Sequence, residues 1–175
     1  EDVVGEDMNW FFDQWYFQAG HPMLEVNYEY VDSLNLVRVN VEQIQNPQRQ
    51  PAIFQMPVAL DFYGQNGEVD RQKIWIDQRV STFEFEVSEK PKLVNFDAEK
   101  ILLCEKIENK TELDYIYQFR NAPLFLDRFE ALSNLSESEN PAAREIFKEA
   151  LNDDFYIIRA YALSIVDLTN EVVEK

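Results

Sequence analysis

The fold is decided by a run at residues 23–30, which reads Met23-Leu24-Glu25-Val26-Asn27-Tyr28-Glu29-Tyr30. Apolar and polar residues alternate there, and a period of two is typical of a strand with one buried face. The sequence repeats this pattern in short segments at residues 24–30, 37–41, 54–62, 69–76, 82–87, 93–96 and 101–107. Turn signals such as Gly64-Gln65-Asn66-Gly67 separate them. Residues 22–109 are therefore expected to form a seven-stranded antiparallel β-sandwich.

Pro57 lies inside the third of these segments. Proline has no N–H to donate to a neighbouring strand. The sequence therefore predicts that residues 54–62 form an edge strand or contain a bulge.

A helical period precedes the strands. Spacings of three and four residues relate Met8, Phe11, Phe12, Trp15 and Ala19, which predicts a helix over residues 8–19. Gly20 and Pro22 are expected to end it. A helix with so many aromatic residues is expected to pack against a larger folded domain.

The helical period returns after residue 110. Thr111 and Asp114 resemble a capping box, Asn121-Ala122-Pro123 starts a second helix, and Asn140-Pro141 starts a third. Asp153-Asp154 is expected to cap a fourth, with Phe155, Ile158, Ala162 and Ile165 facing inward. The pattern predicts helical hairpins stacked as in a solenoid.

Both ends of the chain suggest a piece of a longer protein. The chain starts at Glu1 within an acidic stretch and stops directly after a helical pattern. Two hairpins are also fewer than the roughly three repeats that such arrays usually need.

Composition excludes several classes of function. The chain has 175 residues, 16 Lys and Arg against 33 Asp and Glu, and a formal net charge of -17. Such acidity disfavours nucleic acid and anionic membrane surfaces as partners. No apolar run approaches the roughly 20 residues that span a bilayer. Acidity and aromatic richness together suggest a bacterial protein.

The single histidine and the single cysteine offer little chemistry. His21 lies between Gly20 and Pro22 with no nucleophile or carboxylate spaced to couple with it, which favours a hydrogen-bonding residue in a turn. Cys104 lies in the apolar run Ile101-Leu102-Leu103-Cys104, which favours a buried, unreactive thiol. We therefore expect no catalytic, cofactor-binding or metal-binding residue in the chain.

Other candidates are weaker. Asp61, Asn66, Glu68 and Asp70 surround the Gly64–Gly67 turn, but their spacing does not match a calcium loop. Trp75 is expected to pack in the core or an interface rather than to stack on a sugar. Asn109 and Asn134 begin sequences that match the N-glycosylation pattern, which is common by chance.

Three features carry a resemblance to a known family. They are Phe11-Phe12-x-x-Trp15 running into Gly20-x-Pro22, Phe54-Gln55-Met56-Pro57-Val58 followed by the Asn66-Gly67 turn, and Asp153-Asp154 with Ile158-Arg159 and Ala162. Together they resemble the aminopeptidase N family of zinc metallopeptidases, at the point where the catalytic domain ends. The resemblance implies that residues 1–21 are the terminal helix of a catalytic domain. It also implies a β-sandwich domain at residues 22–109 and the start of a helical HEAT-like domain at residues 110–175.

The resemblance implies a structural role rather than a catalytic one. None of the family's zinc ligands, its glutamate base or its amine-binding acids maps onto a residue of this chain. The intact parent would use one zinc to remove N-terminal residues from peptides, and this part would brace its catalytic domain against its helical domain. Alone, the chain is expected to be inactive and to bind no zinc. The helix at residues 8–19 would fold back on the sandwich or mediate self-association.

Two alternatives stay open. The chain could be a stand-alone β-sandwich module that binds carbohydrate or protein through a sheet face and Trp75. It could also belong to a family member that has lost its zinc motif and serves as a scaffold. An H-E-x-x-H motif upstream in the gene would separate these readings.

Overall fold

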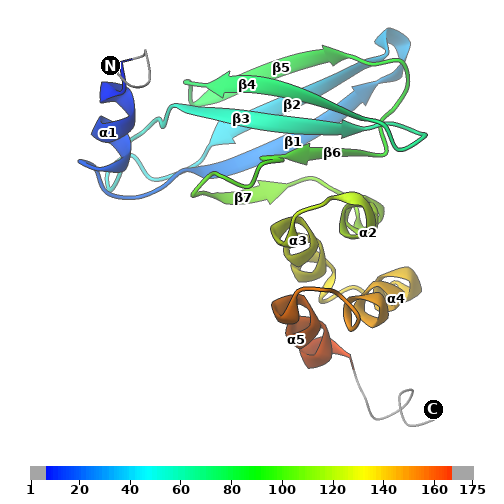
Figure 1. Ribbon diagram of the computed structural model, residues 1–175. Helices are drawn as coiled ribbons and strands as arrows, with labels where there is room; N and C mark the ends of the chain where they lie inside the picture. The colour runs from blue at the N-terminus through cyan, green and yellow to red at the C-terminus, as the bar shows by residue number, and fades with distance from the viewer. Residues whose placement is uncertain (1–6, 167–175) are drawn as a thin grey trace, which may run out of the picture. The chain divides into compact units, whose positions relative to one another are not determined.

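The computed structural model describes residues 7–166 of the chain. The chain divides into two compact units, Glu1–Asn109 and Lys110–Lys175. In the described residues the first unit holds one short helix and two β-sheets, and the second holds four α-helices (Figure 1).

One sheet has four strands, in the order β5 (Val80–Glu86), β2 (Leu36–Gln43), β1 (Met23–Val31) and β7 (Glu105–Glu108). A one-turn 3₁₀ helix, Asp32–Leu34, joins β1 to its antiparallel neighbour β2. β7, however, runs parallel to β1, with Met23 opposite Glu105. The prediction of an all-antiparallel arrangement is therefore wrong at this pair. The reason is that the chain crosses from the other sheet after Phe96 and reaches β1 at the end where β1 begins.

The other sheet has three strands, in the order β4 (Val69–Ile76), β3 (Met56–Tyr63) and β6 (Leu93–Phe96). β3 is the middle strand, so the prediction that it lies at an edge is wrong. However, β6 pairs only with Leu60–Tyr63, whereas Pro57 pairs with Trp75 of β4. Pro57 is thus tolerated because β3 has a strand on only one side at that point.

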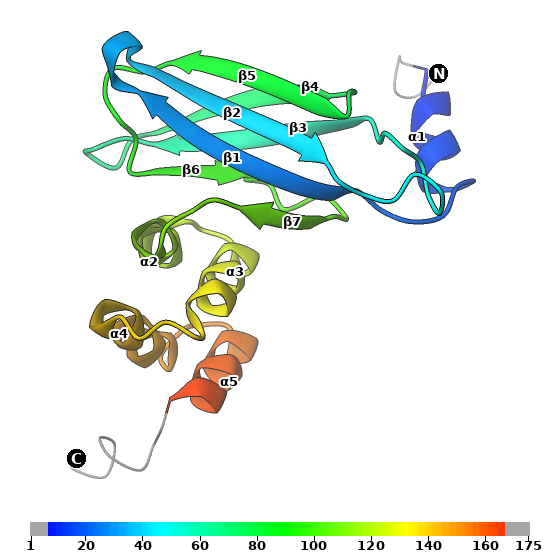
Figure 2. The same cartoon turned by 180° about the vertical axis from the view of Figure 1, so that it is seen from behind.

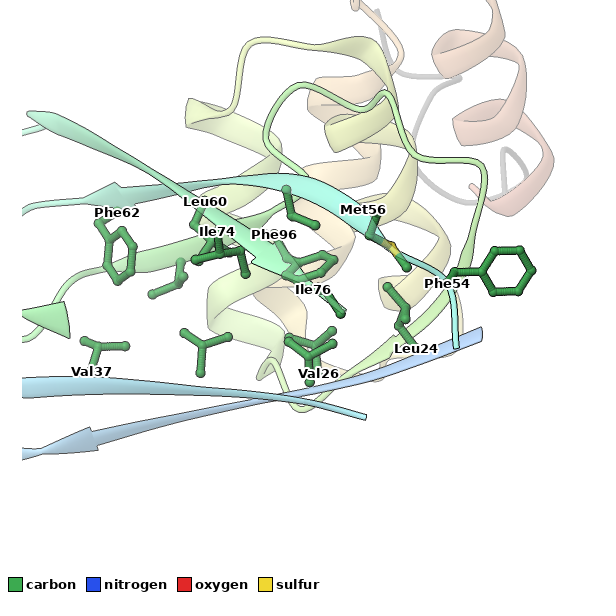
Figure 3. Close-up of a cluster of buried hydrophobic side chains, with 14 residues drawn as sticks. Leu24, Val26, Val37, Phe54, Met56, Leu60, Phe62, Ile74, Ile76 and Phe96 are labelled. Carbon is green, nitrogen blue, oxygen red and sulfur yellow. The ribbon is translucent and has the colours of Figure 1, made fainter. Parts of the chain in front are cut away.

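The two sheets lie face to face (Figure 2). Apolar side chains between them form the core of the first unit (Figure 3). The alternation is clearest in β2, where Val37, Val39 and Val41 are buried. Burying each such side chain stabilises the fold by about 1.5–3 kcal/mol. The buried cluster comprises Leu24, Val26, Val37, Val39, Val41, Phe54, Met56, Val58, Leu60, Phe62, Ile74, Ile76, Val94 and Phe96.

The helix before the strands, α1 (Asn9–Trp15), is shorter than predicted. Its last turn gives way at Tyr16, four residues before Gly20. Gly20 does adopt the left-handed conformation, with φ of 95°, but in the linker to β1 rather than at the end of the helix.

The second unit consists of α2 (Glu112–Asn121), α3 (Phe125–Leu135), α4 (Pro141–Ala150) and α5 (Tyr156–Ile165). The capping box of Thr111 and Asp114 is confirmed at the start of α2, and Asn140 caps α4 directly before Pro141. These side chains accept hydrogen bonds from first-turn N–H groups that have no partner within the helix.

The start of α5 differs from the prediction. Its N-cap residue is Phe155, and no side chain caps it. Asp153 instead accepts a hydrogen bond from the N–H of Phe155 and pairs with Arg128 of α3. Ile165, predicted to face inward, is exposed.

The four helices enclose a second apolar core of their own. Its buried members are Tyr115, Ile116, Phe119, Ala131, Leu132, Leu135, Ala143, Ile146, Phe147, Ala150, Ile158 and Ala162. Across residues 7–166, none of the helices is both long enough and apolar enough to cross a bilayer.

Candidate functional site

Helix α1 lies at one end of the sheets (Figure 1). A side-chain amide holds it there. The side chain of Gln14 is buried and donates through Nε2 to the carbonyl oxygen of Gln55. Its Oε1 accepts from the N–H of Gln55 at 2.8 Å. Gln14 therefore pairs with the backbone of residue 55 as a neighbouring strand would, directly before β3 begins.

Two tryptophans of α1 extend this attachment. Trp10 packs edge-on against Trp75 of β4, with ring centroids 5.0 Å apart. Trp15 packs against Phe54 of the core, with centroids 5.4 Å apart. Such aromatic pairs contribute about 0.5–1.5 kcal/mol beyond the area that they bury.

The linker from α1 to β1 is fixed at two points. The N–H of His21 donates to Oε1 of Gln50 at 3.2 Å, and Nε2 of His21 lies 2.7 Å from Oε1 of Glu105. Gly20 passes so close to Gln50 that a Cβ at residue 20 would lie 2.0 Å from Oε1 of Gln50. The linker thus requires glycine for its conformation and for this close approach.

Other aromatic residues of α1, and two that follow it, are exposed to solvent. We call the exposed side chains of Phe11, Phe12, Tyr16 and Phe17 the aromatic face. Tyr16 and Phe17 are 76% and 73% exposed, and their rings pack together edge-on. The first 37 residues of the sequence contain no lysine or arginine, so the face lies in an acidic stretch. Contiguous apolar surface of this kind marks interaction sites in soluble proteins.

The aromatic residues of α1 that carry the family resemblance divide between the core and the exposed aromatic face. Trp15 faces the core, whereas Phe11 and Phe12 belong to the exposed aromatic face. The role of Gln14 as an anchor was not predicted. Its partner, Gln55, lies 41 residues away in the sequence, so no local pattern identifies the pair.

The structure gives His21 and Cys104 the following surroundings. His21 pairs with Glu105, and Cys104 packs half-buried against the core. His21 therefore holds the linker in place, as expected of a residue in a turn.

The acidic residues around the Gly64–Gly67 turn are engaged in hydrogen bonds within the first unit. Asp61 is buried and accepts two hydrogen bonds from Arg71, at 2.6 and 2.8 Å. Glu68 accepts from the N–H of Asn66, and Asp70 from the side chain of Gln72. Throughout residues 7–166, no three or more His, Cys, Asp or Glu side chains are grouped as metal ligands.

The two asparagines of the glycosylation patterns are also engaged. The side chain of Asn109 accepts from the N–H of Tyr28 at 2.9 Å and donates to its carbonyl oxygen at 3.1 Å. Asn134 lies within α3 and donates to the carbonyl oxygen of Glu130. Both amides therefore act as structural hydrogen-bonding groups.

Buried and paired carboxylates have shifted pKa values. Burial raises the pKa of Asp97, although the N–H groups of Ile101 and Leu102 donate to it. In the second unit the hydrogen bond from Arg120 lowers the pKa of Glu149. Burial opposes ionisation of Asp153, but hydrogen bonds from Arg128 and from the N–H of Phe155 outweigh it and lower the pKa. The ionised forms of Glu149 and Asp153 therefore stabilise the helical unit, whereas the first unit disfavours the ionised form of Asp97.

Comparison with known proteins gives a structural likeness only. No family model matches the sequence, and a search of curated proteins finds no match. Among solved structures, aminopeptidase A of Legionella pneumophila in complex with aspartic acid matches with a TM-score of 0.70 and 17% identity. The match covers 91% of this chain and 20% of that chain. The likeness shows a shared fold, and this chain spans about a fifth of the length of that protein.

Proposed function

We propose that this chain is a non-catalytic structural part of a zinc-dependent aminopeptidase of the aminopeptidase N family. It would brace the catalytic domain against a C-terminal HEAT-like helical domain in a parent that removes N-terminal residues from peptides. The observation that carries the proposal is the likeness to an aminopeptidase over 91% of the chain, which takes in residues of both units.

The aromatic face supports the same proposal. α1 is anchored to the sheets through Trp10, Gln14 and Trp15, whereas Phe11, Phe12, Tyr16 and Phe17 stay exposed. Exposed apolar side chains gathered in one segment are typical of a surface that packs against a second body. We propose that the second body is the catalytic domain, which would hold the one zinc ion.

The test is a two-part reconstitution. The polypeptide encoded upstream in the same gene, which the proposal expects to contain H-E-x-x-H, is produced separately and mixed with this chain. We expect the two to associate and to cleave an aminoacyl reporter, whereas this chain alone should neither cleave it nor retain zinc after dialysis. Cleavage by the chain alone, or an upstream sequence without a zinc motif, would contradict the proposal.

A matched pair of variants locates the contact. Phe12→Ser combined with Phe17→Ser should weaken association at least about tenfold, since hot-spot aromatic residues carry 2 kcal/mol or more each. Leu34→Ser is the control, because Leu34 is similarly exposed but lies in the turn between β1 and β2, at the other end of β1 from α1. Equal effects of the two changes would place the contact elsewhere.

The alternative, a stand-alone module that binds carbohydrate, depends on Trp75. Its side chain is 42% exposed, but the ring already packs against Trp10. Saturable quenching of tryptophan fluorescence by soluble oligosaccharides, abolished in Trp75→Ala, would favour this alternative.

A further inference from the structure

The two hairpins of the second unit repeat each other at an interval of 31 residues. Arg128, Ala131, Leu132 and Ser133 of α3 correspond to Arg159, Ala162, Leu163 and Ser164 of α5. The buried positions of the first helices follow the same interval, since Tyr115, Ile116 and Phe119 of α2 correspond to Ile146, Phe147 and Ala150 of α4. Equivalent residues can therefore be compared directly.

The second hairpin contacts the first at several places, and three of these contacts are made by α3. Arg128 of α3 donates from Nε and Nη2 to the carboxylate of Asp153, at 2.6 and 3.1 Å. Phe125 packs on Phe155 with ring centroids 4.5 Å apart, and Phe129 packs on Tyr161 at 5.2 Å. Leu132, in the same helix, is fully buried.

The corresponding residues of α5 are exposed. Leu163 is 51% exposed, against 0% for its equivalent Leu132, and Tyr156, the equivalent of Phe125, is 64% exposed. Arg128 also donates from Nη1 to the carbonyl oxygen of Pro123, and Arg159 makes the equivalent bond to Asp154. Among residues 7–166, however, no carboxylate occupies the Nε and Nη2 side of Arg159. The outer face of the second hairpin thus repeats the surface that the first hairpin uses to receive the second.

We propose that Tyr156, Arg159 and Leu163 form a docking surface for a further helical hairpin. This hairpin would present apolar residues to Tyr156 and Leu163, and a carboxylate to Arg159 at the position equivalent to Asp153. An arginine with a planar fork of donors suits such a carboxylate. The first hairpin of a second copy fits poorly, because its residue at this position is Ala122.

The test inserts a second copy of residues 136–166 between Val166 and Asp167 of the full chain, which keeps the interval of 31 residues. Repeat arrays gain stability from each interface between neighbouring repeats. We expect the midpoint of thermal unfolding, followed by circular dichroism at 222 nm, to rise by about 4 °C or more. An unchanged or lower midpoint would overturn the proposal.

Two variants make the test specific. Leu163→Asp should leave the midpoint of the original chain almost unchanged but remove the gain in the extended chain. Replacing the inserted equivalent of Asp153 with alanine should remove part of the gain, since it leaves Arg159 without its carboxylate. A gain that survives both changes would come from contacts other than the proposed surface and would contradict the assignment.

A further experiment on the original chain tests whether a second copy of this chain occupies the docking surface. Light scattering should give the same mass for the original chain and for Leu163→Asp. A dimer that becomes a monomer on this substitution would show that the surface binds another copy, and would overturn the proposal of a distinct hairpin.

Discussion

Gln14, Gln43 and Asn109 each use a side-chain amide to pair with both the N–H and the C=O of one backbone residue. Their partners are Gln55, Phe54 and Tyr28, which lie 41, 11 and 81 residues away in the sequence. Polar side chains separated so far from their partners carry no local signal, so the sequence could not predict these anchors. By contrast, Thr111 and Asp114 lie three residues apart, and their capping box could be predicted.

Gln14→Ala should weaken the attachment of α1 by about 1–3 kcal/mol, because the backbone groups of Gln55 lose their partners. Gln14→Glu keeps the shape but places a carboxylate where a donor faced a carbonyl oxygen, so we expect a comparable loss. Hydrogen exchange at the amide of Gln55 should accelerate in both. Gln18→Ala, at an exposed position, is the control and should leave the exchange rate unchanged.

Gly20→Ala and Gly67→Ala form a matched pair at the linker and the β3–β4 turn. Both glycines have positive φ, 95° and 87°, so each substitution should cost about 1–2 kcal/mol from backbone strain. Only Gly20→Ala also places a methyl group against Gln50, since nothing lies within 4 Å of the corresponding position at Gly67. The unfolding free energy measured by tryptophan fluorescence should therefore fall further for Gly20→Ala. Equal losses would show that Gln50 moves aside freely.

At the level of elements, periodicity predicts the strands well and their partners less well. All seven predicted segments contain strands, because alternation depends only on which face is buried. The parallel pairing of β1 with β7 could not be predicted, since alternation shows which face of a strand is buried and not the direction in which its neighbour runs. Helix α1 is shorter than its pattern, because its docked residues are Trp10, Gln14 and Trp15 and the chain then turns toward β1.

The repeat in the second unit gives a comparison between equivalent leucines. Leu132→Ala should cost about 2–5 kcal/mol, because it leaves a cavity in a close-packed core. Leu163→Ala, at the matching but half-exposed position of α5, should cost less than about 1 kcal/mol. Denaturant unfolding followed at 222 nm measures both. Similar losses would mean that Leu163 is covered in solution.

On the scale of the whole molecule, acid should act differently on the two units. The folded-state pKa values of Glu149 and Asp153 lie below their ordinary values of 4.5 and 3.8, so their stabilisation of the helical unit is present above those values. It is lost as the pH falls through the folded-state pKa values. The effect of Asp97 on stability has the opposite pH dependence, because its pKa is raised in the folded state. Its contribution to the stability of the first unit is present below its ordinary pKa of 3.8 and is lost as the pH rises through the folded-state pKa.

All three tryptophans, Trp10, Trp15 and Trp75, lie in the first unit, whereas most helical residues lie in the second. Tryptophan fluorescence and circular dichroism at 222 nm therefore report on different units. Between pH 7 and pH 3, the unfolding free energy followed by circular dichroism at 222 nm should fall more than the unfolding free energy followed by tryptophan fluorescence. In the double variant Glu149→Gln and Asp153→Asn, this acid-induced loss should shrink. A loss that the double variant leaves unaltered would assign the acid sensitivity to other groups.

The side-chain amides also bear on how copies of this protein behave at high concentration. Backbone N–H and C=O groups left open beside a strand are the points at which another chain can add itself and start a fibril. At Phe54, Gln55 and Tyr28 these groups are already occupied by Gln43, Gln14 and Asn109. Of the four edge strands, β4 and β5 carry charged side chains, including Arg71, Lys73, Glu84 and Glu86. The three amides and the charges on these two edges thus remove places where stacking into cross-β aggregates could begin.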